Sequence, residues 1–134
     1  RDIMVPGPYG YLDKIQVNNA LLSDYCKQHN LVGIHAFELC DNNSGLTASC
    51  RNFAPLFGIP EESATGSANG ALACYLTKHL GDKLASPFTF EQGRAMGCVS
   101  RITAEVESNE QGIVKVCVGG FAREIGQQAV PLYL

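Results

Sequence analysis

Residues 51–70 read RNFAPLFGIPEESATGSANG, a pattern that predicts a strand, then a loop containing glycine and proline, then a helix. The helix is predicted to begin at Gly66 or Ser67 and to end near His79, where Leu80-Gly81 stops it. Its early turns carry alanine and glycine on several sides. Because such small side chains let neighbouring elements approach closely, we expect this helix to lie at the centre of the domain.

Strands are predicted on both sides of this helix, over residues 2–5, 32–39, 46–53, 87–92, 101–107 and 113–119, with a short final strand ending at Leu134. An earlier helix is predicted to end near residues 29–30, with Asn18 or Asn19 as its cap and an apolar face of Leu21, Leu22, Tyr25 and Cys26. Many strands and one small-residue helix predict an α+β fold, a curved mixed β-sheet, barrel-like, wrapped around a central α-helix.

The composition is that of one folded domain, with 134 residues, 46% apolar and 17% charged. The net charge is −3 and no basic stripe is present, so we expect no nucleic-acid partner. No apolar run approaches the ~20 residues of a bilayer span, so we expect no membrane partner either. The six cysteines are isolated, and we expect them to be small buried residues, reduced in a cytoplasmic protein. Histidine and cysteine show no metal-site spacing, so no metal is expected.

The predicted start of the second helix is a candidate anion site. The first amide N–H groups of a helix have no intrahelical partner, and the helix dipole adds positive potential there. Gly66 leaves the main chain open, while Thr65, Ser67 and Asn69 add hydroxyl and amide groups. The lysine that a nucleotide-binding loop requires is absent, so a single carboxylate fits better than a triphosphate. The alternative is that these residues are ordinary helix caps and that Glu61 and Glu62 are solvated.

The same stretch resembles the signature of the phenazine biosynthesis PhzF-like family, whose members are related to diaminopimelate epimerase. The family pattern is Arg-x-Phe-x-Pro, then Gly-Ile-x-Glu-Asp-Pro-x-Thr-Gly-Ser-Ala, running into Leu-x-x-Tyr-Leu. This chain supplies, in register, Arg51, Phe53, Pro55, Gly58, Ile59, Glu61, Thr65, Gly66, Ser67, Ala68, Leu72, Tyr75 and Leu76. Residues 92–97 (QGRAMG) and 116–120 (VCVGG) resemble two later markers, so the resemblance covers essentially the whole chain.

The resemblance implies two similar halves, each a curved sheet around a central helix, with the active site between them. It implies a cofactor-independent isomerase or epimerase that moves a proton on a small carboxylate substrate, which in the phenazine enzyme is a dihydro-hydroxyanthranilate. Residues 1–134 form one domain that resembles only the C-terminal half. The family's principal catalytic Glu and its Gly-His-x-Thr motif belong to the first half, and the sequence opens at Arg1 within a predicted strand. We therefore expect a segment to be missing before it.

Carried over by position, the resemblance implies one catalytic residue and four substrate-binding residues. Glu62 stands where the family has Asp and is the expected acid/base. Gly66 and Ser67 match the positions that hold the substrate carboxylate, and Thr65 and Gly93 are expected to complete the binding site. Ser63 replaces a family Pro, and Cys98-Val99 replaces Arg-Pro, which sets the chain apart from the phenazine enzyme. Cys74 lies two turns inside the helix, so it is not expected to be a catalytic thiol, and Cys98 is a weak candidate.

The leading hypothesis is thus the C-terminal half of an isomerase or epimerase that is silent on its own. Its expected partners are the missing N-terminal half or a second copy of the chain, as a homodimer. The alternative is a non-catalytic carboxylate-binding or dimerising module. A thioesterase with a hot-dog fold, which also wraps a sheet around one helix, is a more distant alternative.

Overall fold

The computed structural model describes residues 1–84 and 86–133. The helices are α1 (Asn19–Gln28) and α2 (Gly66–Leu80), with short 3-10 turns η1 (Leu12–Lys14), η2 (Pro55–Phe57) and η3 (Arg94–Met96). The strands are β1 (Asp2–Gly7), β2 (Gly33–Leu39), β3 (Ala48–Ala54), β4 (Ile59–Glu62), β5 (Phe88–Gln92), β6 (Ser100–Asn109) and β7 (Gly112–Gly120).

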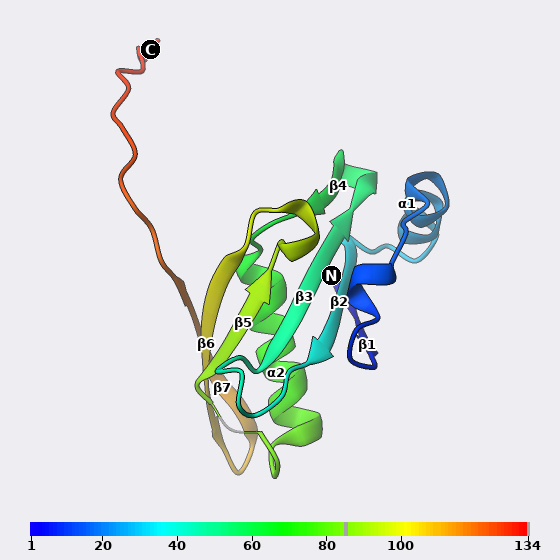
Figure 1. Cartoon of the computed structure of the whole chain (residues 1–134), viewed down its shortest axis with the longest axis vertical. Coiled ribbons are helices and arrows are strands. Elements are labelled where there is room, and N and C mark those ends of the chain that lie inside the picture. The colour runs from blue at the N-terminus through cyan, green and yellow to red at the C-terminus, as the bar shows by residue number, and fades with distance from the viewer. Residues whose placement is uncertain (85, 134) are drawn as a thin grey trace.

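These strands form one mixed sheet that curves around α2 (Figure 1). The order is β1-β2-β3-β5-β6-β7, and β4 pairs with β3 beside this path. The β1–β2 and β3–β5 pairs are parallel, whereas the others are antiparallel. The predicted α+β fold with a curved sheet around a central helix is therefore confirmed.

The small residues of α2 place the helix directly against the sheet. Ala68, Leu72, Ala73 and Leu76 are fully buried in the helix. Leu72, Ala73 and Leu76 pack in a core formed with sheet residues that include Phe37, Cys50, Phe88, Phe90 and Ala104. A Cβ added at Gly70 would lie 3.0 Å from a methyl group of Val118, so a larger residue there would push α2 away from β7. Close packing of this kind explains why small residues occur on several sides of the helix.

The sheet forks beside the start of α2. Residues 48–50 of β3 pair with β5, while Asn52 and Ala54 of the same strand pair with β4 across an irregular step. β4 and β5 therefore diverge from one edge of β3. The residues of β4 were predicted to form a loop, because Pro60 and two glutamates are poor strand formers. Because β4 is an edge strand, it tolerates Pro60, which has no backbone N–H to donate to a neighbouring strand.

Two sequence-based predictions were wrong in whole or in part: the apolar face of the first helix and the final strand. In α1, Asn18 is the cap, since its Oδ1 accepts from the amide of Leu21 at 3.1 Å, and Cys26 is buried, but Leu21 and Tyr25 are exposed. Residues 121–133 contain no strand and run away from the sheet, while Leu134 lies outside the described residues (Figure 1). A strand needs a neighbouring strand for its hydrogen bonds, and this segment has none among the described residues.

The cysteines are not uniformly buried. All six are free thiols; Cys26 and Cys50 are buried, whereas Cys98 and Cys117 are exposed. The apolar neighbours of Cys117 belong to β7, whose outer face is not covered by the described part of the chain. Among the described residues, no helix is both long enough and apolar enough to cross a membrane.

Candidate functional site

The candidate site lies in the fork of the sheet, where three chain segments end or begin together. Glu62 is the last residue of β4, Thr65 is the cap of α2, and Gln92 is the last residue of β5. Glu62 and Thr65 are half-buried, while Gln92 is fully buried. The fork therefore brings together residues that are 30 positions apart in the chain.

Thr65 is bonded to Glu62 and does not cap the helix with its side chain. Its hydroxyl donates to Oε2 of Glu62 at 2.5 Å, and α2 has no side-chain capping bond at this residue. A carboxylate next to a helix N-terminus is stabilised by the helix dipole. The ordinary capping alternative is therefore wrong for Thr65, because its side-chain oxygen accepts from Gln92 Nε2 and from no amide of the helix.

The first turn of α2 presents open main chain beside this pair. Gly66 and Ser67 are exposed. A Cβ built on Gly66 would meet only one atom, a methyl carbon of Val118 at 3.9 Å. No side chain among the described residues accepts a hydrogen bond from the amides of Gly66, Ser67 or Ala68. The amides of Gly66 and Ser67 are available to an anion, with β7 forming a nearby wall, whereas Ala68 is fully buried.

Two buried amide side chains support the pair from behind. Gln92 Nε2 donates to the backbone oxygen of Glu62 at 2.7 Å and to the hydroxyl of Thr65 at 2.9 Å. Asn69 Nδ2 donates to Gln92 Oε1 at 2.7 Å and to the backbone oxygen of Thr65 at 2.8 Å. The sequence analysis assigned Asn69 to the open anion site. That assignment was wrong, because the side chain is fully buried and turned toward Gln92.

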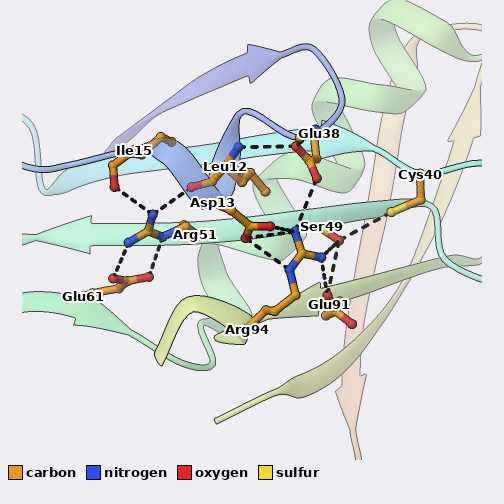
Figure 2. A network of polar contacts seen from close by, with 11 residues as sticks. Leu12, Asp13, Ile15, Glu38, Cys40, Ser49, Arg51, Glu61, Glu91 and Arg94 are labelled. Atoms are coloured by element: carbon orange, nitrogen blue, oxygen red, sulfur yellow. Dashed lines mark hydrogen bonds and ion pairs between the residues drawn. The ribbon is translucent and has the colours of Figure 1, made fainter. Parts of the chain in front are cut away.

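The two adjacent glutamates of β4 have different surroundings. Glu61 forms a two-pronged ion pair with Arg51, at 2.8 and 2.9 Å, and Arg51 also donates to the backbone oxygens of Leu12 and Ile15 (Figure 2). Both charged side chains are mostly buried. This ion pair anchors β4 to β3 and to the η1 turn, and Glu62, the next residue, turns to the α2 side. The alternative, in which both glutamates are solvated, is therefore wrong.

Gly93 lies behind the fork. Its φ is +90°, and an added Cβ would lie 2.2 Å from the backbone oxygen of Cys98 and 3.0 Å from that of Ser63. Only glycine fits this contact, which holds the β4–α2 loop against the segment after η3. Gly93 is buried, so the expected substrate contact stays a prediction.

Neither of the two cysteines considered as catalytic thiols has a hydrogen bond to Glu62 or Thr65 among the described residues. Cys98 is exposed in the loop after η3, and its amide donates to the oxygen of Gly93 at 3.1 Å. Cys74 is half-buried within α2. Within the described ranges, no cluster of three or more His, Cys, Asp or Glu residues is arranged to hold a metal ion.

The supporting residues Gln92 and Asn69 were missed as functional residues, although their sequence positions contain a signal. Gln92 follows Phe88 and Phe90 at every second residue, so a strand places it on the same inward face. Asn69 lies four residues after Thr65 on the helix and between residues of the buried face. A polar residue at an inward position is a candidate for a buried network, because burying it unpaired is costly.

Comparisons with known proteins find related sequences and similar folds. The sequence profile of a family described as Phenazine biosynthesis-like protein (PhzC-PhzF) matches residues 8–126. An uncharacterized isomerase of Clostridium acetobutylicum is 34% identical over 114 residues, covering 83% of this chain and 38% of the relative. The trans-2,3-dihydro-3-hydroxyanthranilate isomerase of Pseudomonas fluorescens is 31% identical over 93 residues, covering 69% of this chain and 34% of that enzyme. The chain spans well under half the length of these curated relatives.

Two solved structures share the fold. A phenazine biosynthesis protein of the PhzF family from Bacillus anthracis superposes with a TM-score of 0.69 at 19% identity, covering 88% of this chain and 45% of that one. A protein of Pseudomonas aeruginosa described as a "Predicted Epimerase" superposes with a TM-score of 0.56 at 25% identity, covering 94% of this chain and 43% of that one. In both, the matched part is less than half of the longer chain.

Proposed function

Since this chain belongs to the phenazine biosynthesis-like protein family, we propose that it is the C-terminal half of a cofactor-independent isomerase or epimerase. The substrate class is a small molecule bearing a carboxylate, on which the enzyme moves a proton. The observation that carries this proposal is the Glu62–Thr65 pair beside the uncapped first turn of α2. It combines a group that exchanges protons with a site for an anion.

The two parts of the site have separate roles. The amides of Gly66 and Ser67 bind the substrate carboxylate, which fixes the position of the carbon skeleton relative to Glu62. Glu62 takes a proton from one carbon, and the electron pair of the broken C–H bond moves into the adjacent unsaturated system. A proton is then added at another carbon, or on the other face of the same one. No electron is gained or lost overall, so the reaction is an isomerisation.

The second wall of the site comes from outside this chain. β7 carries exposed apolar side chains, Ile113, Val114 and Val118 among them, and the segment after it exposes Phe121, Ile125, Val130, Leu132 and Tyr133. Apolar surface of this extent favours a protein partner. The partner we propose is the N-terminal half of a family member, which supplies the second group for proton transfer.

Carboxylate binding is the first test. Benzoate is titrated into the 15N-labelled chain, and benzamide, which has the same shape without the charge, is the control. We expect benzoate to shift the amide signals of Gly66, Ser67 and Ala68, and benzamide to leave them unchanged. Equal shifts with both probes, or shifts elsewhere only, would contradict the anion site.

Activity is the second test, and it needs both halves. The chain is mixed with the N-terminal half of a relative, and deuterium uptake from D2O into trans-2,3-dihydro-3-hydroxyanthranilate is followed by NMR. We expect uptake only with both halves present, and Glu62→Gln to slow it about 100-fold or more. Uptake that is unaffected by Glu62→Gln would remove Glu62 from the mechanism.

The alternative is a non-catalytic carboxylate-binding or dimerising module, in which a second copy covers the same apolar surface. The exposed apolar residues of β7 are the observation that favours it. Sedimentation of the chain alone separates the two readings. A stable homodimer that binds benzoate and takes up no deuterium with any N-terminal half supports the module, whereas a monomer supports the half-enzyme.

A further inference from the structure

A row of buried polar side chains lies behind the Glu62–Thr65 pair, on α2 and on the strands that pack against it. His35 on β2, Asn52 on β3, Asn69 on α2 and Gln92 on β5 are all buried. The rest of this inner face of the sheet is apolar. A buried polar group that lacks a hydrogen-bond partner is costly, so the bonding of each member can be followed atom by atom.

The orientation of two of these amides is determined by their neighbours. Gln92 Nε2 faces two acceptors, the backbone oxygen of Glu62 and the hydroxyl oxygen of Thr65, so it is the NH2 end. Its Oε1 accepts from Asn69 Nδ2 at 2.7 Å. The second proton on Asn69 Nδ2 goes to the backbone oxygen of Thr65. This arrangement leaves Asn69 Oδ1 as an acceptor with no bond of its own.

Two buried atoms at the other end of the row have no hydrogen-bond partner among the described residues: Asn69 Oδ1 and His35 Nε2. Burial lowers the pKa of His35, and contacts with Asn52 and Asn69 act in the opposite direction, so the Asn69 side chain is a close neighbour of the ring. The other ring nitrogen, Nδ1, lies 3.0 Å from the side-chain oxygen of Asn52. The roles of the two ring nitrogens depend on where the proton sits.

We propose that neutral His35 carries its proton on Nε2 and donates it to Asn69 Oδ1, while Asn52 turns its NH2 group toward Nδ1. One bond then satisfies both unpartnered atoms. With the proton on Nδ1, both Nε2 and Asn69 Oδ1 would stay buried without a hydrogen-bond donor. The NH2 and oxygen ends of Asn52 are interchangeable by a half-turn of the amide, so this change needs no backbone movement.

The result is one directional chain of donors, His35 to Asn69 to Gln92 to Thr65 to Glu62. Gln92 Nε2 donates to the oxygen of the Thr65 hydroxyl. The hydroxyl proton is therefore directed at Glu62 and not at solvent or a helix carbonyl. His35, Asn69 and Gln92 are thereby positioning residues that hold the Glu62 carboxylate in one orientation. This role rests on the proposed function in one respect: Glu62 is taken to be the group that transfers the proton.

The tautomer is tested on the unmodified chain. Long-range 1H–15N spectra at pH 7.5 distinguish a protonated Nε2 from a protonated Nδ1 in each histidine. We expect the Nε2–H form for His35, with a slowly exchanging ring proton. An Nδ1–H form would show that His35 does not donate to Asn69 and that the series of donors begins at Asn69. That result would overturn the proposal. This measurement needs no ligand, so it is independent of any failure to find activity.

The positioning role is tested with Gln92→Glu, which keeps an acceptor for Asn69 and removes both donor N–H groups. The matched control is Gln111→Glu, the same change on the exposed β6–β7 turn. We expect the amides of residues 65–69 to exchange hydrogen about tenfold faster in Gln92→Glu and within about twofold of the parent in the control. Equal exchange in all three proteins would contradict the role of Gln92.

A kinetic readout separates positioning from general stability. In the two-half deuterium-uptake assay, we expect Gln92→Glu to lower kcat at least about tenfold while KM changes less than about threefold, because the Gly66–Ser67 anion site is retained. A rise in KM with unchanged kcat would place Gln92 in substrate binding and overturn the proposal. If the assay shows no uptake with the parent chain, the proposed function fails while the tautomer and exchange results still decide this inference.

Discussion

The hydroxyl of Thr65 donates to the carboxylate of Glu62 at 2.5 Å, although Thr65 occupies the cap position of α2. In most helices that begin with threonine, the side-chain oxygen accepts from a backbone amide of the first turn. Here the hydroxyl is turned the other way, so the helix start is left open and the glutamate is held in place. The open helix start favours a ligand with a negative charge, and the fixed glutamate places a proton-exchanging group beside it.

Replacing Thr65 should reveal the value of this bond. Thr65→Val removes the hydroxyl from Glu62 and leaves one N–H of Gln92 without an acceptor, so we expect the free energy of unfolding to fall by about 1–3 kcal/mol. Thr65→Ser keeps the hydroxyl, and we expect a loss below about 1 kcal/mol. Urea unfolding followed by circular dichroism measures both. Equal losses would assign the effect to the methyl group and not to the hydrogen bonds.

The Arg51–Glu61 ion pair should stabilise β4 far more than an exposed pair does. Arg51→Met leaves Glu61 unpaired in a mostly buried position and also removes the bonds to the oxygens of Leu12 and Ile15, so we expect a loss of about 2–4 kcal/mol. The control, Lys115→Met, breaks an exposed pair with Glu107 at 3.6 Å and should cost less than about 1 kcal/mol. Urea unfolding again gives both values, and similar losses would contradict the anchoring role.

Gly93 and Gly97 form a matched pair for testing the fork. Both have a positive φ, but only at Gly93 does an added Cβ meet protein, the oxygen of Cys98 at 2.2 Å. We expect Gly97→Ala to cost about 1–2 kcal/mol from its backbone conformation alone. Gly93→Ala should cost at least about 1–3 kcal/mol more, because the loop holding Ser63 must shift. Thermal unfolding compares the two variants. Equal midpoints would show that the segment at Cys98 can move away from an added Cβ at little cost in free energy.

The stability of the chain should fall in mild acid because of His35. Burial lowers the pKa of this residue below its ordinary value of 6.5, so the unfolded state binds more protons than the native state below that pH. The free energy of unfolding therefore decreases as the pH is lowered from about 7.5 to 5.5. Urea unfolding across this range measures the slope. His35→Gln should flatten it, whereas His79→Gln, at an exposed position, should leave it unchanged.

Thiol labelling should follow the observed burial of the cysteines. Cys98 and Cys117 are exposed, whereas burial raises the pKa of Cys26 and of Cys50. A buried thiol has little thiolate and little access to reagent, so we expect the first two to react with an aromatic disulfide reagent in the native chain. Cys26 and Cys50 should react only after unfolding. Mass spectrometry of the labelled peptides identifies the sites, and early labelling of Cys50 would contradict the packing of α2 on β3.

Local patterns in the sequence were enough to predict the elements that have a strong period or a clear end. The alternation of Ile102, Ala104 and Val106 predicted an inward face of β6, and these residues point to the core. The small-residue stretch predicted that α2 is central and predicted its limits to within one or two residues. β4 was not predicted, because an edge strand with a proline and two glutamates resembles a loop until its partner is known. The predicted final strand does not occur in residues 121–133.

The sequence by itself determined the fold class, the position of the helix N-terminus and the family, since each depends on residues that are close together or on a motif in order. Only the tertiary structure decided that Thr65 bonds Glu62, that Glu61 pairs with Arg51, and that Gln92 lies behind both. Those contacts join β3, β4, β5 and α2 at a fork of the sheet. Their partners are set by which strands and helix ends are neighbours in space, and a side chain's spacing along the sequence does not say which of its neighbours it will bond.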